Sequence, residues 1–192
     1  MSSAQGERLS VAQTFVVVGP PAAGKSTTSR ALCETFPRSV HISVDKLRET
    51  VVTGLVLPSP RWSDELAQQV TLARESAIDM AARYEHAGFT VVVDDFVDPH
   101  GLVEYERLSG RSDVRRVVLF PSQEEAHRRN AEREGDTPER DYIDAGIRHV
   151  YGLIRASAAK LRRDGWHFVD STSMTVDQTV ARIKQPADRA DR

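Results

Sequence analysis

The chain has 192 residues, of which 40% are hydrophobic, and its 26 basic and 28 acidic residues leave a formal net charge of −2. This length suits one globular domain and makes two full domains unrealistic. The near balance of charge gives no electrostatic case for wrapping a nucleic acid or lying on an anionic membrane, although a local basic groove would still be compatible with it.

The first residues and the single cysteine bear on where the protein works. The start lacks the basic-then-apolar order of a secretory signal, and no apolar run approaches the roughly 20 residues of a membrane span. Cys33 has no cysteine to pair with and is expected to be a small buried helix residue. We expect a cytoplasmic protein without a membrane partner, one domain over residues 14–185, and flexible tails at 1–13 and 186–192.

Short apolar runs alternate with longer stretches of helical period, which is typical of an α/β fold. Residues 14–18 are apolar throughout and predict a central parallel strand covered on both faces. A helix is expected over about 25–36. A second strand at 40–43 leads into residues 45–48, after which two prolines interrupt the chain.

The middle of the chain begins with a long helix of one apolar stripe. Ser63 and the two acidic residues behind it predict its start, and the helical spacing runs up to Gly88. Residues 90–93 predict the third strand. Asp98 and Pro99 predict an N-cap followed by proline at the first position of a new helix.

The last third continues the alternation. Strands are expected at 114–120 and 167–169, and capping boxes at 122–125 and 175–178 each predict a helix start. The first of these helices becomes very basic. After a polar break, a longer helix is expected over about 140–163.

Residues 19–26 match G-x-x-x-x-G-K-[S/T] between a predicted strand and a predicted helix, the context that this phosphate-binding motif requires. Its glycines allow N–H groups to point at phosphate, Lys25 reaches the β- and γ-phosphates of ATP, and the Ser26 hydroxyl coordinates Mg²⁺. The predicted phosphate-binding residues are Gly19, Pro20, Pro21, Ala22, Ala23, Gly24, Lys25, Ser26 and Thr27.

A carboxylate at the end of the third strand would stand beside Ser26 and hold the hydration shell of the metal. Asp94 and Asp95 both end that strand, and the sequence does not choose between them. The alternative is that one of them caps the turn that follows.

Four segments together resemble the adenylate-kinase-like P-loop phosphotransferases: 19–27, 41–48, 91–95 and 129–133. Within that group the chain is similar to AAA-type and zeta-toxin-like sugar-nucleotide kinases, chloramphenicol phosphotransferase and polynucleotide 5′-hydroxyl kinases. The resemblance covers about 14–183. It implies a three-layer P-loop fold with a five-stranded parallel sheet of order 2-3-1-4-5 and a helical lid.

The resemblance also implies roles near the acceptor. Asp45 stands where these kinases have the aspartate that takes the proton from the acceptor hydroxyl, and Arg48 where the polynucleotide kinases contact the acceptor or the transferring phosphate. The alternatives are that Asp45 N-caps the helix that it begins and that Arg48 is a surface residue.

On the nucleotide side, the resemblance implies that Arg129 and Arg133 lie on a lid helix over the triphosphate, and that Ser171 and Thr172 lie by the adenine. Mobile arginines stabilise charge on a transferring phosphoryl group. The alternative is that these arginines, with Arg128, form a solvated helix face.

The acceptor side is the least defined. The chain from Val51 to Trp62 and the long helix after it are expected to wall the acceptor pocket, where Trp62 either stacks on a planar acceptor or packs in the core. The histidines lack ligand-like spacing and are expected in structural or surface roles. They are His41, His86, His100, His127, His149 and His167.

Together these features predict an ATP- and Mg²⁺-dependent kinase whose acceptor is a hydroxyl of a small molecule such as an antibiotic, a sugar or a metabolite. A polynucleotide 5′-hydroxyl is the alternative acceptor, which net charge does not favour. A regulatory protein that hydrolyses or merely binds ATP is the alternative of another class.

Overall fold

The structure has a strand at each of the five places where the sequence predicts one. The computed structural model describes residues 13–58 and 62–185, so both predicted tails lie outside the described residues except for Gln13. In chain order the elements are β1 Thr14–Val18, α1 Lys25–Glu34, β2 Ser39–Ser43, α2 Val44–Arg48, α3 Asp64–His86, β3 Thr90–Asp95, the 3₁₀ helix η1 Val103–Leu108, β4 Val114–Leu119, α4 Gln123–Glu134, α5 Pro138–Arg163, β5 Trp166–Val169 and α6 Val176–Lys184.

All of these strands are parallel and lie in the order β2-β3-β1-β4-β5, which confirms the predicted fold. Their carboxyl ends therefore meet at one edge of the sheet, where α/β proteins of this kind bind their ligands. The register places Asp94 of β3 opposite both Val17 of β1 and Ser43 of β2. The predicted phosphate loop thus leaves the central strand beside the predicted metal carboxylates.

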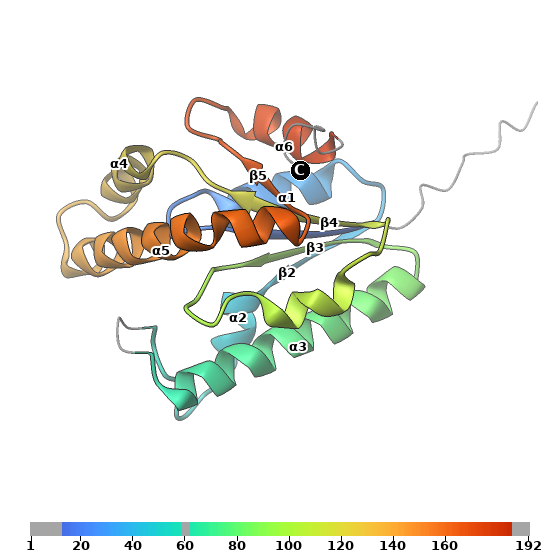
Figure 1. The fold of residues 1–192 in the computed structure, drawn as a ribbon, viewed down its shortest axis with the longest axis horizontal. Coiled ribbons are helices and arrows are strands. Elements are labelled where there is room, and N and C mark those ends of the chain that lie inside the picture. The colour runs from blue at the N-terminus through green and yellow to red at the C-terminus, as the bar shows by residue number, and fades with distance from the viewer. Residues whose placement is uncertain (1–12, 59–61, 186–192) are drawn as a thin grey trace, which may run out of the picture.

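The side chains of β1 alternate between two separate cores. Val16 and Val18 pack with residues of α3, η1 and α5, whereas Phe15 and Val17 pack with α1, including Cys33, and with α6. Figure 1 shows the resulting layers, with α1 and α6 on one side of the sheet and α3 and η1 on the other. Among the described helices, none is long and apolar enough to cross a membrane.

Side-chain caps begin most of the longer helices. Ser63, Ser122 and Thr175 each accept a hydrogen bond from the backbone N–H three residues later, as predicted. The reciprocal half of the capping box is present at Thr175. At Ser122 the prediction of a full box is wrong in part, because the Glu125 carboxylate accepts hydrogen bonds from two arginines instead.

The predicted helix start at Asp98 and Pro99 is wrong. The Asp98 carboxylate accepts from the backbone N–H groups of His100 and Gly101, and Gly101 has a φ of 90°. This is a turn closed by an aspartate and completed by a left-handed glycine, for which Asp-Pro-x-Gly is as suitable a sequence as for a helix start. The helical segment that follows, η1, begins only at Val103.

One buried arginine ties this turn to the rest of the fold. The guanidinium of Arg74, on α3, lies 2.6 Å from Asp95, 2.5 Å from Asp98 and 3.2 Å from Glu104. It also donates to the carbonyl oxygens of Phe96 and Gly101. We call these four charged residues the Arg74 cluster. It holds the chain after β3 against α3 and so fixes one wall of the site described below.

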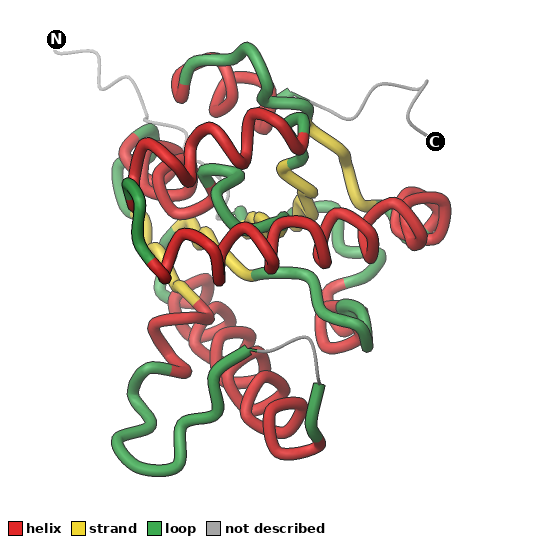
Figure 2. The backbone as a smooth tube through the Cα atoms, turned by 90° about the vertical axis from the view of Figure 1, so that its left-hand side faces the viewer, coloured by secondary structure: helices red, strands yellow, loops and turns green. Residues whose placement is uncertain are grey.

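The loop between α2 and α3 is held in a similar way. The Gln69 side chain on α3 donates to the carbonyl oxygen of Gly54 over 2.8 Å and accepts from the N–H of Val56 over 3.0 Å. Figure 2 shows this loop folded back beside the first turns of α3.

Candidate active site

The loop between β1 and α1 has the backbone that phosphate binding requires. A Cβ on Gly19 would lie 2.3 Å from the carbonyl oxygen of Leu119, so a larger residue would force the backbone to move. Gly24 is the N-cap of α1 with a φ of 89°, and it offers no side chain to the first N–H groups of the helix. Those N–H groups and the helix dipole suit an anion.

Lys25 lies at the centre of this loop. Its ammonium donates to the carbonyl oxygen of Pro20 over 3.0 Å, and the side chain lines a cavity of about 390 Å³. Burial lowers the pKa of Lys25, while the carboxylates of Asp45, Asp94 and Asp95 act to raise it. The lysine is therefore a half-buried cation near acidic groups, in a position to pair with phosphate.

Asp94 is the aspartate that faces the phosphate loop. Its Oδ1 lies 3.5 Å from the Ser26 hydroxyl and 3.4 Å from the Ser43 hydroxyl. Its Oδ2 makes a short hydrogen bond with the ring of His41 on β2. Sequence reasoning gave His41 a structural or surface role and missed this contact, because it arises only from the pairing of β2 with β3.

Asp95 points the other way. Its carboxylate accepts from Arg74, from the Tyr105 hydroxyl over 3.1 Å and from the backbone N–H of Phe96 over 2.7 Å. Burial raises the pKa of Asp95 to about 6, and Arg74 opposes that rise. Asp95 thus fits the alternative of a residue that holds the following turn, and Asp94 is left as the candidate metal residue.

Asp45 lies in the first turn of α2 and lines the same cavity as Lys25 and Ser26. The N-cap of α2 is Ser43, so the alternative in which Asp45 caps this helix is wrong. Its side chain is 51% exposed and is free to meet an acceptor.

Arg48 is buried, so the alternative of a surface residue is also wrong. It donates to the carbonyl oxygen of Val56 over 2.7 Å, and its Nη1 lies 3.8 Å from Asp45. Arg48 is not among the described residues that line the cavity. This geometry suits a residue that positions Asp45 and the loop after α2 better than one that contacts the acceptor.

The walls of the cavity differ from those predicted. Pro58 and Trp62 contribute as expected, but α3 contributes none of the described lining residues. The opposite wall is α5, and the Tyr142 hydroxyl on that helix donates to the carbonyl oxygen of Pro58, which joins the two walls. The residues that α5 adds are Tyr142, Ile143, Ala145, Gly146, His149, Val150 and Leu153.

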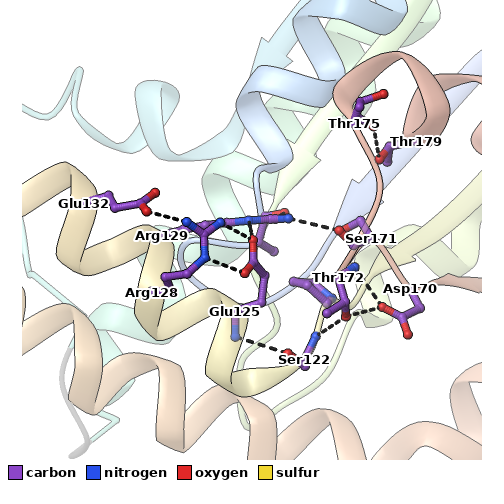
Figure 3. Close-up of polar contacts among 12 residues, drawn as sticks. Ser122, Glu125, Arg128, Arg129, Glu132, Asp170, Ser171, Thr172, Thr175 and Thr179 are labelled. Atoms are coloured by element: carbon purple, nitrogen blue, oxygen red, sulfur yellow. Dashed lines mark hydrogen bonds and ion pairs between the residues drawn. The ribbon is translucent and has the colours of Figure 1, made fainter.

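The basic helix α4 does not form a uniform solvated face. Arg129 donates to the carbonyl oxygen of Ala23 over 3.0 Å. It also donates to the carbonyl oxygen of Ser171 over 3.0 Å and to Glu125 over 2.7 Å, as Figure 3 shows. It therefore ties α4 to the phosphate loop and to the segment after β5. Arg128 points to solvent and pairs with Glu125 and Glu132, so the solvated-face alternative is right for Arg128 and wrong for Arg129.

Arg133 has a third arrangement. It is more than half exposed, pairs with Glu134, and lines the same cavity as Lys25. Of the three arginines on α4, Arg133 is the one that lines this cavity. That Arg133 lies over the triphosphate stays a prediction. Its place in the lining of the cavity is compatible with that role.

A second pocket, of about 520 Å³, lies on the other side of the phosphate loop. Ser171 and Thr172 line it together with Gly24, Thr27 and Arg129. The Thr172 hydroxyl accepts from the backbone N–H of Ser122 (Figure 3), and the buried Ser171 hydroxyl has no hydrogen-bond partner in the described part of the chain. An unsatisfied hydroxyl beside the loop suits the base or ribose of a nucleotide.

The oxygen atoms of Ser26 and Asp94 fit Mg²⁺. This ion is usually held by one or two carboxylates together with substrate phosphates and waters, not by a full protein cage. In keeping with that, the described residues contain no group of three or more His, Cys, Asp and Glu side chains that could hold a metal.

Asp94→Asn is expected to raise the Mg²⁺ concentration needed for half-maximal ATP turnover by about 10- to 100-fold. The reason is that one carboxylate oxygen would be replaced by an amide that carries no charge. The measurement is the Mg²⁺ concentration for half-maximal ATP turnover. Asp79→Asn, at an exposed position on α3, is the matched control and should leave that concentration unchanged. Equal Mg²⁺ dependence in both variants would remove Asp94 from the metal site.

The sheet order and the loop at residues 19–27 define the protein as a P-loop domain, which implies that it binds a nucleotide. The chain belongs to the AAA domain family, whose model matches residues 15–149. No curated protein matches the sequence.

Solved structures share the fold at low sequence identity. The chain is similar to a gluconokinase from Sinorhizobium meliloti 1021, with 18% identity, a TM-score of 0.60 and 90% of each chain covered. It is also similar to the shikimate kinase from Bacteroides thetaiotaomicron, with 14% identity, a TM-score of 0.61, and 90% of this chain and 96% of that one covered. The shikimate kinase from Acinetobacter baumannii, in complex with shikimate, has 16% identity, a TM-score of 0.59 and 90% of each chain covered. At these identities the likeness shows the fold.

Proposed function

We propose that the protein is an ATP-dependent kinase that transfers the γ-phosphoryl group to a hydroxyl of a small molecule. One observation carries the proposal: Lys25 and Ser26 of the phosphate loop and Asp45 of α2 line a single cavity, which continues between Trp62 and α5. A protein that only bound or hydrolysed ATP would have no use for this extension. The fold shared with gluconokinase and shikimate kinases supports the same class.

The residues divide the work between binding and chemistry. The loop N–H groups and Lys25 bind the phosphates, and Arg129 holds the loop in place through the carbonyl of Ala23. Arg133 supplies positive charge from the cavity side. Ser26 and Asp94 would hold Mg²⁺, which when bound neutralises charge on the β- and γ-phosphates.

Asp45 acts on the acceptor. It accepts the proton as the hydroxyl oxygen forms a bond to the γ-phosphorus, while the bond from that phosphorus to the β–γ bridging oxygen breaks and ADP leaves with its electron pair. Lys25 and Arg133 stabilise the charge that spreads over the transferred group. The buried thiol of Cys33 suits the reducing cytoplasm, which we propose as the protein's location.

The test is a screen of hydroxyl compounds and a 5′-hydroxyl oligonucleotide with γ-labelled ATP and Mg²⁺. The expected result is label on a small molecule, lost in Lys25→Met. Label at the 5′ end of the oligonucleotide, with steep salt dependence, would make the protein a polynucleotide kinase. ATP hydrolysis that no compound accelerates would contradict the kinase proposal and favour a regulatory NTPase.

A further inference from the structure

The part of the cavity away from the phosphate loop is apolar. Aromatic rings from two segments face it, with the Trp62 ring centroid 6.3 Å from that of Phe96. Aliphatic side chains from the segment after β3 and from α5 complete the wall. The residues concerned are Trp62, Phe96, Val97, Ile143, Val150 and Leu153.

The charged groups near this wall already have partners. The Asp98 carboxylate is buried and pairs with Arg74 at 2.5 Å. Arg48 donates to Val56 and lies 3.8 Å from Asp45; its Nε has no hydrogen-bond partner in the described part of the chain, but Arg48 is not among the described residues that line the cavity. Among the described lining residues, the remaining basic side chains are Lys25 and Arg133, which stand on the phosphate side, and His149 on α5.

Among the described residues, an acidic acceptor would therefore have to bury its carboxylate against aromatic and aliphatic groups, with no lysine or arginine on this side of the cavity. Burial of an unpaired charge is costly, whereas apolar surface gains about 25 cal/mol for each Å² removed from water. We infer that the acceptor is an uncharged hydroxyl compound with an aromatic or alicyclic body, and not a hydroxy acid. This inference rests on the proposed function and names the acceptor class of the same cavity.

A matched pair of acceptors isolates the charge. Methyl 4-(hydroxymethyl)benzoate and 4-(hydroxymethyl)benzoate share the ring and the reacting hydroxyl and differ by one negative charge. Binding is measured by calorimetry in the presence of Mg²⁺ and a non-hydrolysable ATP analogue, and transfer is measured with γ-labelled ATP. The ester should bind at least tenfold more tightly than the acid and be phosphorylated faster. Shikimate and gluconate should behave like the acid.

The outcomes separate the inference from the function. Tighter binding and faster phosphorylation of the acids would overturn the inference and leave the kinase proposal standing. Tight binding of the ester without any transfer would support an apolar site and contradict the kinase proposal. If neither member of the pair binds, the inferred acceptor class is wrong.

A charge placed on the wall provides a second readout. Leu153→Arg puts a guanidinium among the lining residues of α5 and should reverse the preference, with binding of the acid gained by tenfold or more relative to the ester. Leu72→Arg is the matched control, because Leu72 is 56% exposed on α3 and does not line the cavity. Thermal melting of both variants confirms folding. An unchanged preference in a folded Leu153→Arg protein would contradict the inference.

Discussion

Arg74→Met is expected to lower the free energy of unfolding by about 3–5 kcal/mol, the usual cost of removing one partner from a buried ion pair. Arg74 is 1% exposed and pairs with three carboxylates that are themselves almost inaccessible to water. Methionine fills much of the volume but leaves Asp95, Asp98 and Glu104 without their counter-charge. It also leaves the carbonyl oxygens of Phe96 and Gly101 without this donor.

The loss of unfolding free energy in Arg74→Met should depend on pH in a definite direction. Burial already raises the pKa of Asp95 to about 6 against the opposing effect of Arg74, so removal of Arg74 should raise it further. A carboxyl whose folded pKa lies above its unfolded value of about 4 binds a proton more tightly in the folded state. It therefore lowers the free energy of unfolding progressively as pH rises from the unfolded pKa through the folded pKa. The deficit of the variant should therefore be larger at pH 8 than at pH 5.

Urea unfolding at both pH values measures the deficit. Arg107→Met is the control, since Arg107 is exposed on η1 and lies 3.9 Å from Asp79, which is also exposed, a pair worth about 0–1 kcal/mol. A loss below about 1 kcal/mol at pH 8 in Arg74→Met would show that the Arg74 cluster does not carry the stability assigned to it.

The strands were predictable because each one contains a short apolar stretch, which in β1 and β3 is continuous, as in a parallel strand buried on both faces. The bounds of β1 agree with the run 14–18, and the last helix begins at its predicted capping box. The strand order followed from the resemblance and not from periodicity. Arg74 escaped notice because a buried arginine on an amphipathic helix is indistinguishable in sequence from an exposed one.

The candidate site was predictable only where the residues are close in the chain. The phosphate loop is one continuous motif, but the choice between Asp94 and Asp95 depends on which side of β3 faces Ser26. The contact between His41 and Asp94 joins two strands, and the wall supplied by α5 joins helices far apart in sequence. Alternation along β3 sends neighbouring aspartates to opposite faces, so the register was the missing information.

Asp45→Asn is expected to lower the turnover number for acceptor phosphorylation by about 10²- to 10⁴-fold, the usual contribution of a positioned general base. Asparagine keeps the size and can still accept a hydrogen bond from the hydroxyl, but it cannot take its proton. Asp45 is not a predicted ligand of the metal or of ATP, so the dissociation constant for ATP should change little.

The turnover number and the dissociation constant for ATP together distinguish two roles for Asp45. A loss confined to turnover identifies Asp45 as a group that acts on the acceptor, whereas a parallel loss of ATP affinity would assign it to the nucleotide site. Asp141→Asn, on the exposed face of α5 and outside the cavity lining, is the matched control. If Asp45→Asn phosphorylates the acceptor at the rate of the unchanged protein, proton removal by Asp45 is excluded. Transfer would then depend on positioning and charge stabilisation by the phosphate loop alone.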